Sequence, residues 1–365
     1  MSRATWAVIG AVCTATVLYA VYQGGRVAWH LLGFLIMLAL VVAVTQGGPL
    51  SSVEVRRRIG PGPYFAGDAA PVDLEVSIKR RWFWPQLTVT DQLPAELGVA
   101  QPKFLLARVG KLTSLAYQIP QLKRGVFEWD QVVLSTSDVF GLFPRNRQVS
   151  LPSRLVVWPQ TVSLTGSDLF SRAWRGENLS PQPTRQESAH LRGIREYVPG
   201  DRLSHVHWKT SAHTGDFKVK QFEPETKPEF TVVLDAAHYF SEQDWELAIS
   251  AAASLVRYAH SAREAIGLAV LDRPELVYPP ALGQTHLAAM MNLLADLAWD
   301  PHSSQSTIVL PDARRVVITP STRAERWTRQ ADILIAIGMG GLTHLSDLPH
   351  LIRPARVGGQ GGVTS

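Results

Sequence analysis

A polar stretch in the middle of the chain, residues 191–221, gathers side chains that could do chemistry. Its sequence, LRGIREYVPGDRLSHVHWKTSAHTGDFKVKQ, mixes cations, histidines, serines and rings with almost no hydrophobic periodicity. A linker would carry few aromatic residues, and a core strand could not bury so many charges without partners. The stretch is therefore the first candidate for a functional site.

Several of these side chains suggest a hydrolytic site. Ser204 and Ser211 flank His207, with Asp201 nearby, and a serine nucleophile needs such a base and an orienting carboxylate. The chain has no G-x-S-x-G turn, however, and neighbours in sequence need not share triad geometry. A hydrolase that uses Asp201, His207 and Lys209 is kept as an alternative, and we expect a protein that is not an enzyme.

The histidines of the stretch invite a zinc site. His205 and His207 alternate, with His190 and His213 on either side. Zinc takes three or four ligands in a tetrahedron, but alternate residues of a strand point to opposite faces. Because no nearby cysteine or H-E-x-x-H helix adds ligands, we expect no zinc and a half-buried, hydrogen-bonded His207. The chain also lacks a G-x-x-x-x-G-K-[ST] loop, so it is not expected to bind ATP itself.

The same stretch fits a role as a polar clamp. Pro199 and Gly200 suit a type II turn, and Asp201 can accept backbone N–H groups or pair with Arg195 or Arg202. Arginine and aromatic side chains dominate interface hot spots. Whether the clamp joins two domains or meets a partner stays open. The candidate interaction residues are Arg195, Tyr197, Gly200, Asp201, Arg202, His207, Trp208 and Lys209.

The chain resembles the domain of unknown function 58 family at these residues. The similar runs are Arg195-Glu196-Tyr197-Val198-Pro199-Gly200-Asp201-Arg202, His207-Trp208-Lys209, Ser211-Ala212, Arg124-Gly125 and Ser137-Asp138-Val139-Phe140-Gly141-Leu142-Phe143. The resemblance implies a membrane hairpin, a β-rich domain and a von Willebrand factor type A-like domain in one chain. It also implies a MoxR-type AAA+ ATPase as the partner, but no particular reaction.

An acidic residue, Asp235, follows the apolar run Phe230–Leu234, where a buried strand is expected to end. In open α/β sheets the usual site lies at the carboxyl ends of the central strands. The resemblance implies that Asp235 begins the Asp-x-Ser-x-Ser metal loop of von Willebrand factor A domains and that Thr285 matches a later threonine ligand.

The metal loop is incomplete in this chain. Asp235-Ala236-Ala237-His238-Tyr239 lacks both serines, and Val317-Ile318-Thr319-Pro320-Ser321 offers no carboxylate. Mg²⁺ wants several oxygen ligands in octahedral geometry, and one carboxylate with one hydroxyl is a poor cage. We therefore expect no metal and no other cofactor. Asp235 is expected to bond the backbone or the polar stretch.

The elements before these residues begin with two uncharged runs, 4–22 and 27–45. Each is long enough as a helix to cross a bilayer, so residues 1–49 are predicted to be a transmembrane hairpin. A cleaved signal peptide is the alternative for the first run, but no small-x-small site follows it. Arg56-Arg57-Arg58 outweigh Arg26 in the turn, so the positive-inside bias predicts an inner-membrane protein with both termini in the cytoplasm.

Residues 50–158 change to a period of two. Val72–Ile78 alternates strictly, Leu87–Thr90 repeats the pattern, and turn residues separate such runs. This predicts an antiparallel β-sandwich of immunoglobulin-like size. The Trp82-Phe83-Trp84 cluster either touches a membrane or partner or lies buried under the sheet edge.

The rest of the chain alternates strands and helices. Residues 159–225 read as a polar connecting segment, with possible disorder over 174–190. Residues 226–355 predict a doubly wound α/β domain of the von Willebrand factor A-like kind, with a capping box at Ser241. A disordered tail is expected at 356–365.

Composition narrows the class of partner. The net charge of +5 is diffuse and no nucleic-acid motif accompanies it, so no nucleic-acid partner is expected. The single cysteine, Cys13, permits no disulfide within the chain. The sequence predicts a membrane-anchored binding or assembly module that works with a MoxR-type ATPase and other proteins of its membrane system. The further alternative is a metal-dependent adhesion or ligand receptor.

Overall fold

The computed structural model describes most of the chain. The described residues are 3–45, 50–78, 87–106, 112–141, 144–164, 191–201, 203–222, 229–271, 273, 276–302, 310, 313–351 and 353–354. Trp82-Phe83-Trp84, Arg202, the segment 174–190 and the tail 356–365 lie outside them. The chain divides into two compact units, one of Met1–Gln160 and Ala295–Leu297 and the other of Thr161–Leu294 and Ala298–Ser365.

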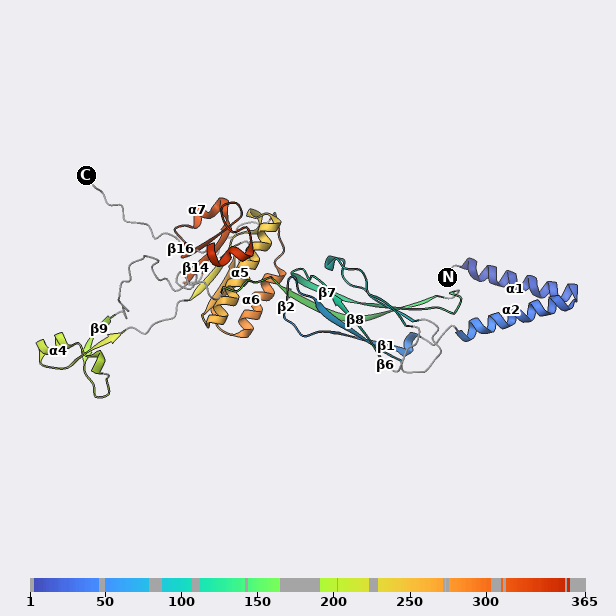
Figure 1. The fold of residues 1–365 in the computed structure, drawn as a ribbon, viewed down its shortest axis with the longest axis horizontal. Helices are drawn as coiled ribbons and strands as arrows, with labels where there is room; N and C mark the ends of the chain where they lie inside the picture. Colours follow the sequence, from blue (N-terminus) through green and yellow to red (C-terminus); the bar gives the residue numbers. More distant parts are fainter. Residues whose placement is uncertain are drawn as a thin grey trace. The chain divides into compact units, whose positions relative to one another are not determined.

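Two helices open the chain. α1 (Arg3–Gln23) and α2 (Arg26–Thr45) run side by side, as Figure 1 shows, and only Gly24 and Gly25 separate them. Gly24 has a φ of 60°, a left-handed conformation that glycine adopts without strain. Within the described residues, no helix is both long enough and apolar enough to cross a membrane.

Two sheets lie in the described part of residues 50–158. The first is antiparallel, in the order β1-β3-β6, with β1 (Val53–Ile59), β3 (Ala70–Ile78) and β6 (Leu112–Ile119). The second has the order β2-β8-β7-β4-β5, and only its short β2–β8 pair is parallel. Its strands are β2 (Tyr64–Phe65), β4 (Leu87–Asp91), β5 (Lys103–Leu106), β7 (Gly125–Thr136) and β8 (Arg145–Trp158).

The inner faces of the two sheets share two cores, so the sheets pack face to face as a sandwich. One core, near residue 50, joins Val53 and Leu74 of the first sheet to Leu87 and Leu134 of the second. The other core lies toward the opposite end of the strands, where Val72 is one of its residues. The alternation predicted for Val72–Ile78 is confirmed, because β3 buries every second residue along most of its length.

A buried ion pair crosses the sandwich beneath a β-bulge. The β7–β8 register shifts after Trp129, and Pro152 on β8 has no N–H for the ladder. From β1, the Arg57 NH1 group donates to the Leu151 carbonyl (2.6 Å), and its Nε donates to Asp91 Oδ2 (3.0 Å). The Arg57 and Asp91 side chains are 1% and 0% exposed. Arg57 thus satisfies a carbonyl beside the bulge, and Asp91 balances its charge.

Residues 191–222 form a small unit that we name the signature hairpin. β9 (Leu191–Glu196) pairs antiparallel with β10 (Lys218–Phe222), and α4 (Trp208–Thr214) lies between them in the chain. An isolated bridge joins Val206 to Val219, and both residues are buried. The sequence did not predict this regular structure, since the stretch has no clear hydrophobic period.

A six-stranded mixed sheet completes the chain. Its order is β13-β12-β11-β14-β15-β16, with four parallel central strands and antiparallel edges. The strands are β11 (Phe230–Leu234), β12 (Ile266–Val270), β13 (Val277–Ala281), β14 (Arg314–Pro320), β15 (Ile333–Ile337) and β16 (Arg353–Pro354). The helices are α5 (Glu242–Ala262), α6 (Gln284–Asp296), α7 (Ala324–Trp327) and α8 (Leu348–Leu351). The parallel strands and their helices confirm the α/β prediction, whereas the two edge strands were not expected.

The order of the central strands creates a switch point. The chain places β12 on one side of β11 and β14 on the other, so the winding reverses between β11 and β14. Helix α5 packs across the central strands, and Ser241 caps it by accepting a hydrogen bond from Asp244 N (3.1 Å), as the sequence predicts. The carboxyl ends of β11 and β14 therefore flank the place where open α/β sheets bind ligands.

Candidate functional site

Asp235 lies at this switch point and is fully buried. Both of its carboxylate oxygens already have partners. Oδ1 accepts from Ala236 N (2.9 Å) and faces Arg323 NH1 (3.4 Å). Oδ2 accepts from Thr319 Oγ1 (2.8 Å) and Trp327 Nε1 (3.3 Å). Asp235 thus bonds the backbone, as one of the two sequence alternatives expected, and its other partners are side chains of β14 and the segment after it, not of the polar stretch.

Arg323 supplies the positive charge at this site. Its guanidinium carbon lies 3.4 Å from the centroid of the Tyr239 ring, and only 14% of its side chain is exposed. A buried carboxylate needs a cation or several hydrogen bonds to remain charged. Here a guanidinium and three N–H or O–H donors meet that need. A metal ion would have to displace them.

Thr285 does not belong to this site. It is exposed on the first turn of α6, which follows β13. Because β13 runs antiparallel to β12 and Ala281 pairs with Ile266, α6 begins at the amino ends of the parallel strands. Asp235 lies at their carboxyl ends, so the structure does not bring Thr285 to the site of Asp235. Within the described residues, no group of three or more His, Cys, Asp or Glu could hold a metal ion.

The signature hairpin brings Arg195 and Asp201 together. Arg195 binds the carboxylate with both ends of its guanidinium, NH1 to Oδ2 at 2.7 Å and NH2 to Oδ1 at 2.6 Å. Val198 N also donates to Oδ2 (3.0 Å), and Gly200 has a φ of 114° in the turn between them. The Arg195 guanidinium and then the Val198 N–H hold the pKa of the Asp201 carboxyl below its ordinary value. The predicted turn and ion pair are thus both present.

His207 and Ser211 hold the backbone of the hairpin. His207 Nδ1 accepts from Thr210 N (3.2 Å) and caps α4. Ser211 is buried and its Oγ accepts from Lys218 N (2.8 Å), which joins α4 to β10. Asp201 is bound to Arg195, so these side chains have structural partners where a hydrolase would need a nucleophile, a base and an orienting acid in contact.

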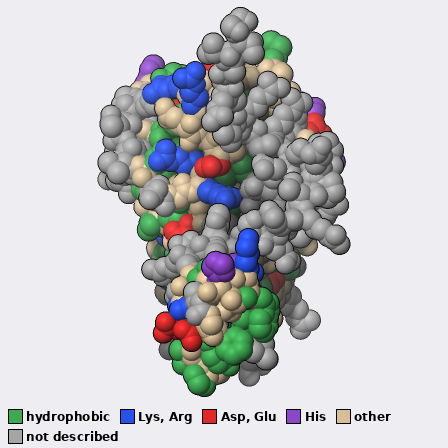
Figure 2. All heavy atoms as spheres, turned by 90° about the vertical axis from the view of Figure 1, so that its left-hand side faces the viewer, with side chains coloured by type: hydrophobic (Ala, Val, Ile, Leu, Met, Phe, Trp, Pro, Cys, Tyr) green, Lys and Arg blue, Asp and Glu red, His purple; other side chains and the backbone are tan. Residues whose placement is uncertain are grey.

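Apolar side chains cover the outside of the signature hairpin. Trp208 is 61% exposed, Val198 57%, Phe217 56% and Ile194 41%. Phe217 contacts two rings, with centroids 6.0 Å from Tyr197 and 6.1 Å from Trp208. Figure 2 shows hydrophobic side chains gathered at the lower end of the face that carries this unit. Trp208 and Phe217 are thus in contact, and together with the other two exposed apolar residues of this unit, Ile194 and Val198, we name them the apolar face of the hairpin.

The remaining signature residues lie at the border of this face. Tyr197 is half-buried, and Lys209 is exposed on α4. Arg195 keeps 42% of its side chain exposed while it binds Asp201. Arg202 lies outside the described residues. The hairpin therefore presents Trp208 and Tyr197 beside Arg195, and Trp, Tyr and Arg are the residues enriched in protein interface hot spots.

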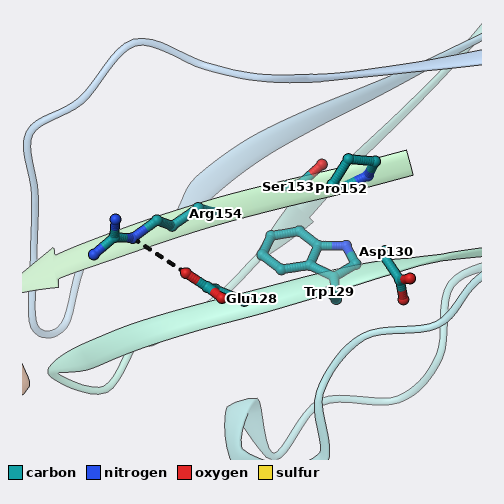
Figure 3. Close-up of a pocket in the computed structure, with 6 residues that line it drawn as sticks. All are labelled: Glu128, Trp129, Asp130, Pro152, Ser153 and Arg154. Atoms are coloured by element: carbon teal, nitrogen blue, oxygen red, sulfur yellow. Dashed lines mark ion pairs between the residues drawn. The ribbon is translucent and has the colours of Figure 1, made fainter. Parts of the chain in front are cut away.

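A separate cavity of about 440 Å³ opens over the β7–β8 bulge (Figure 3). Glu128 and Arg154 form an exposed ion pair across it at 3.4 Å. Trp129 Nε1 is buried and has no hydrogen-bond partner among the described residues. No predicted site residue lines the cavity, whose walls are Glu128, Trp129, Asp130, Pro152, Ser153 and Arg154.

Sequence reasoning missed the partners of Asp235 and three of the four residues of the apolar face, Ile194, Val198 and Phe217. Thr319, Arg323 and Trp327 carry no local pattern that points to residue 235. Ile194 and Phe217 resemble ordinary strand residues, and only their exposure marks them. One signal could have placed Thr319 near Asp235. Thr319 follows a second apolar run, and the carboxyl ends of neighbouring parallel strands lie at the same end of a sheet.

The fold defines a multi-sheet α/β protein with a parallel-rich sheet, whose switch-point carboxylate is bound by the protein's own side chains. Residues 193–335 match the family model described as "Protein of unknown function DUF58", so this region of the chain belongs to the DUF58 family and the resemblance is confirmed.

Two further comparisons extend beyond this region. The "Uncharacterized protein YeaD" of Bacillus subtilis (strain 168) is 27% identical over 363 residues, which cover 96% of this chain and 85% of that protein. Among solved structures, Cwp6 from Clostridium difficile is 7% identical with a TM-score of 0.17, over 66% of this chain and 31% of that one. This chain thus spans about a third of Cwp6, and so low a TM-score supports no shared fold.

Proposed function

We propose that this protein is a membrane-anchored binding or assembly module without catalytic activity. In this proposal the signature hairpin docks a MoxR-type AAA+ ATPase, in a system that matures or remodels proteins of the envelope. The observation that carries it is the apolar face of the hairpin, four large exposed side chains on a unit whose turn is fixed by the Arg195–Asp201 pair. The choice of ATPase rests on the family resemblance.

The apolar face has the chemistry of a docking surface. Soluble proteins commonly expose single apolar residues, but a contiguous apolar patch marks an interaction site. Trp208 and Phe217 meet edge to face, with an interplanar angle of 84°, which fixes the orientation of both rings before any partner binds. A surface ordered in advance loses less side-chain entropy on association.

The anchor in this proposal is the hairpin predicted from the two uncharged runs 4–22 and 27–45, spanning the cell membrane twice with both termini in the cytoplasm. It rests on these runs, because no helix among the described residues is long and apolar enough to cross. Large apolar side chains are exposed along it, among them Leu18, Trp29, Phe34 and Leu40. Arg56, Arg57 and Arg58 follow it and favour the cytoplasmic side. The finer fold assignments, an immunoglobulin-like sandwich and a von Willebrand factor A-like domain, belong to the same proposal.

The geometry at Asp235 favours this proposal over a metal-dependent receptor. Its oxygens have four partners, so Mg²⁺ would have to break existing bonds. Addition of Mg²⁺ or of a chelator should therefore leave the melting temperature of the purified chain unchanged. A metal-dependent rise of several degrees would instead favour the receptor.

The hydrolase alternative makes a different demand on His207. If the chain is an enzyme, some turnover must disappear in His207→Ala while the fold survives. In our proposal this variant instead loses the cap of α4, which costs roughly 1 kcal/mol of local stability.

Affinity capture from membranes tests the docking surface. The tagged full-length chain is recovered with and without a non-hydrolysable ATP analogue, and the retained proteins are identified by mass spectrometry. Wild-type protein should retain an AAA+ ATPase in a nucleotide-dependent way, whereas Trp208→Ala should retain at least about tenfold less, since hot-spot rings contribute 2 kcal/mol or more.

The matched control is Leu282→Ala, which removes another apolar side chain of similar exposure, 62%, from outside the hairpin. It should bind as wild type does. Equal recovery of the ATPase by Trp208→Ala and Leu282→Ala would show that the apolar face is not the docking surface. Absence of any ATPase from the wild-type capture would refute the partner.

A further inference from the structure

The described part of the β-sandwich has four exposed large hydrophobic side chains. Leu112 is 66% exposed, Leu105 60%, Val139 56% and Phe140 52%. They come from different strands and a turn, so no single amphipathic element explains them. We name these four residues the apolar tip.

In the five-stranded sheet, three members of the apolar tip lie at one end. Leu87 of β4 pairs with Leu106 on one side and with Thr136 on the other. Leu105 is therefore level with the end of β7, from which the chain continues to Val139 and Phe140. These exposed groups belong to the end of the sheet where β4 begins.

The first sheet contributes Leu112 at the same end. Leu112 opens β6 opposite Ser77, near the end of β3, and Val53 opens β1 opposite Ile78. Arg147 of β8 links the two sheets there, because its NH1 donates to the Val53 carbonyl of β1 (3.3 Å) as well as to the nearby Leu50 carbonyl (2.6 Å). The apolar tip therefore lies at the end of the sandwich where the chain enters it from α2.

The turn that carries Val139 and Phe140 is held in shape. Gly141 N donates to Asp138 O (3.0 Å), and Phe140 N donates to Asp138 Oδ2 (3.1 Å). Asp138 is buried, and Gly141 has a φ of 71°. Central turn residues are usually Gly, Pro, Asn, Asp or Ser. Here a fixed turn holds two large apolar side chains in water.

A short tether joins this end of the sandwich to α2. Helix α2 ends at Thr45 and the next described residue is Leu50. Five residues reach at most about 18 Å even when fully extended. The apolar tip therefore cannot lie far from the end of α2, and Val44 on the last turn of α2 is itself 60% exposed.

We propose that the apolar tip rests in the headgroup region of the bilayer in which α1 and α2 are anchored. The sandwich then contacts the membrane with this one end. This inference rests on the membrane anchoring proposed above. Phenylalanine and branched aliphatic side chains gain free energy on leaving water, and Phe and Leu are typical of surfaces that lie in the headgroup boundary. The tether places the tip within reach of that interface, and it gives no other occupant the same proximity.

Depth-dependent fluorescence quenching tests the contact in the full-length chain. The protein is reconstituted in phosphatidylcholine and phosphatidylglycerol vesicles that contain a nitroxide-labelled lipid, and bimane is attached to one cysteine at a time. The native Cys13 in α1 reports on anchoring. Val139→Cys and Leu112→Cys, each with Cys13→Ala, report on the tip. Ala69→Cys in the same background is the matched control, because Ala69 is exposed at the opposite end, next to the Ala70–Ile119 pair.

We expect strong quenching at Cys13 and at both tip positions. Quenching at the tip should exceed that at position 69 at least about threefold, since interfacial groups enter about 5–10 Å into the headgroup boundary. If Cys13 is quenched but both tip positions are quenched no more than position 69, the anchor is right and the proposed contact of the tip with the bilayer is wrong. A protein that covers the tip would give this same result. If Cys13 is not quenched, the anchoring proposal fails and this inference fails with it.

Discussion

The clearest stability test concerns the ion pair that crosses the β-sandwich. Replacing Arg57 by Met keeps much of the side-chain volume and removes the charge. Asp91, which is 0% exposed, then keeps the hydrogen bond that the Tyr117 hydroxyl donates to its Oδ2 (2.7 Å) but loses its cation. The Leu151 carbonyl beside the bulge also loses its donor. We therefore expect Arg57→Met to weaken the sandwich strongly.

The size of the effect follows from the burial. Breaking a buried ion pair by removing one partner costs about 3–5 kcal/mol, because the other charge is left uncompensated. At about 1.4 kcal/mol for each factor of ten, amide hydrogens of β7 and β8 should exchange about 10²- to 10⁴-fold faster. Hydrogen exchange with mass spectrometry measures this region alone, so the other unit of the chain need not unfold with it.

Arg154→Met is the matched control for this experiment. It removes the same type of side chain from β8, beside the same bulge, but the Arg154–Glu128 pair is 64% and 68% exposed. An exposed pair contributes at most about 1 kcal/mol, or about fivefold in exchange. Similar exchange in the two variants would refute the reasoning that burial makes the Arg57–Asp91 pair important.

Three more predictions concern other polar groups. Arg323→Ala should destabilise β11 by about 2–3 kcal/mol, measured by hydrogen exchange, because Asp235 loses its cation; unchanged protection would contradict the assigned role. The folded pKa of Asp201 is lowered, so its contribution to stability is present above the unfolded pKa of about 3.9 and is lost as pH falls through the folded value; a carbon-13 titration should show the lowered value, and Arg195→Gln should raise it toward the ordinary one, with the Val198 N–H still lowering it. Burial and the hydrogen bond to a carboxylate raise the pKa of Tyr117, so its contribution is present below about pH 10 and lost as pH rises further. Between about pH 9 and 11, the melting temperature of Tyr117→Phe should then fall less than that of the parent chain. An equal fall of the two melting temperatures would count against this.

Local patterns predicted the parts of the fold in which one face or one strand is buried. The alternation at Val72–Ile78 arises because β3 has one face in the core, and the unbroken apolar run at Phe230–Leu234 arises because β11 is buried on both faces. The Pro199-Gly200 turn and the cap at Ser241 were also predictable, since each depends on residues within three or four positions.

The contacts around Asp235 could not be predicted in this way. Thr319, Arg323 and Trp327 are 84 to 92 residues away from Asp235 along the chain, and only the sheet order brings them together. For a related reason, it could not be predicted that Thr285 lies away from Asp235. An antiparallel strand, β13, precedes α6 and returns the chain to the amino ends of the parallel strands. Its short Val277–Ala281 sequence has no distinctive alternation.

The Arg57 bonds also determine when the sandwich can be completed during synthesis of the chain. Arg57 lies near the start of the sandwich, and its carbonyl acceptor Leu151 lies 94 residues later. At about 5–20 residues per second, the ribosome delivers β8 roughly 5–20 s after β1. During that interval Arg57 lacks the Leu151 carbonyl, the nearer of its two carbonyl acceptors at the bulge. The last long strand of the sandwich must therefore emerge before the first can take its final place.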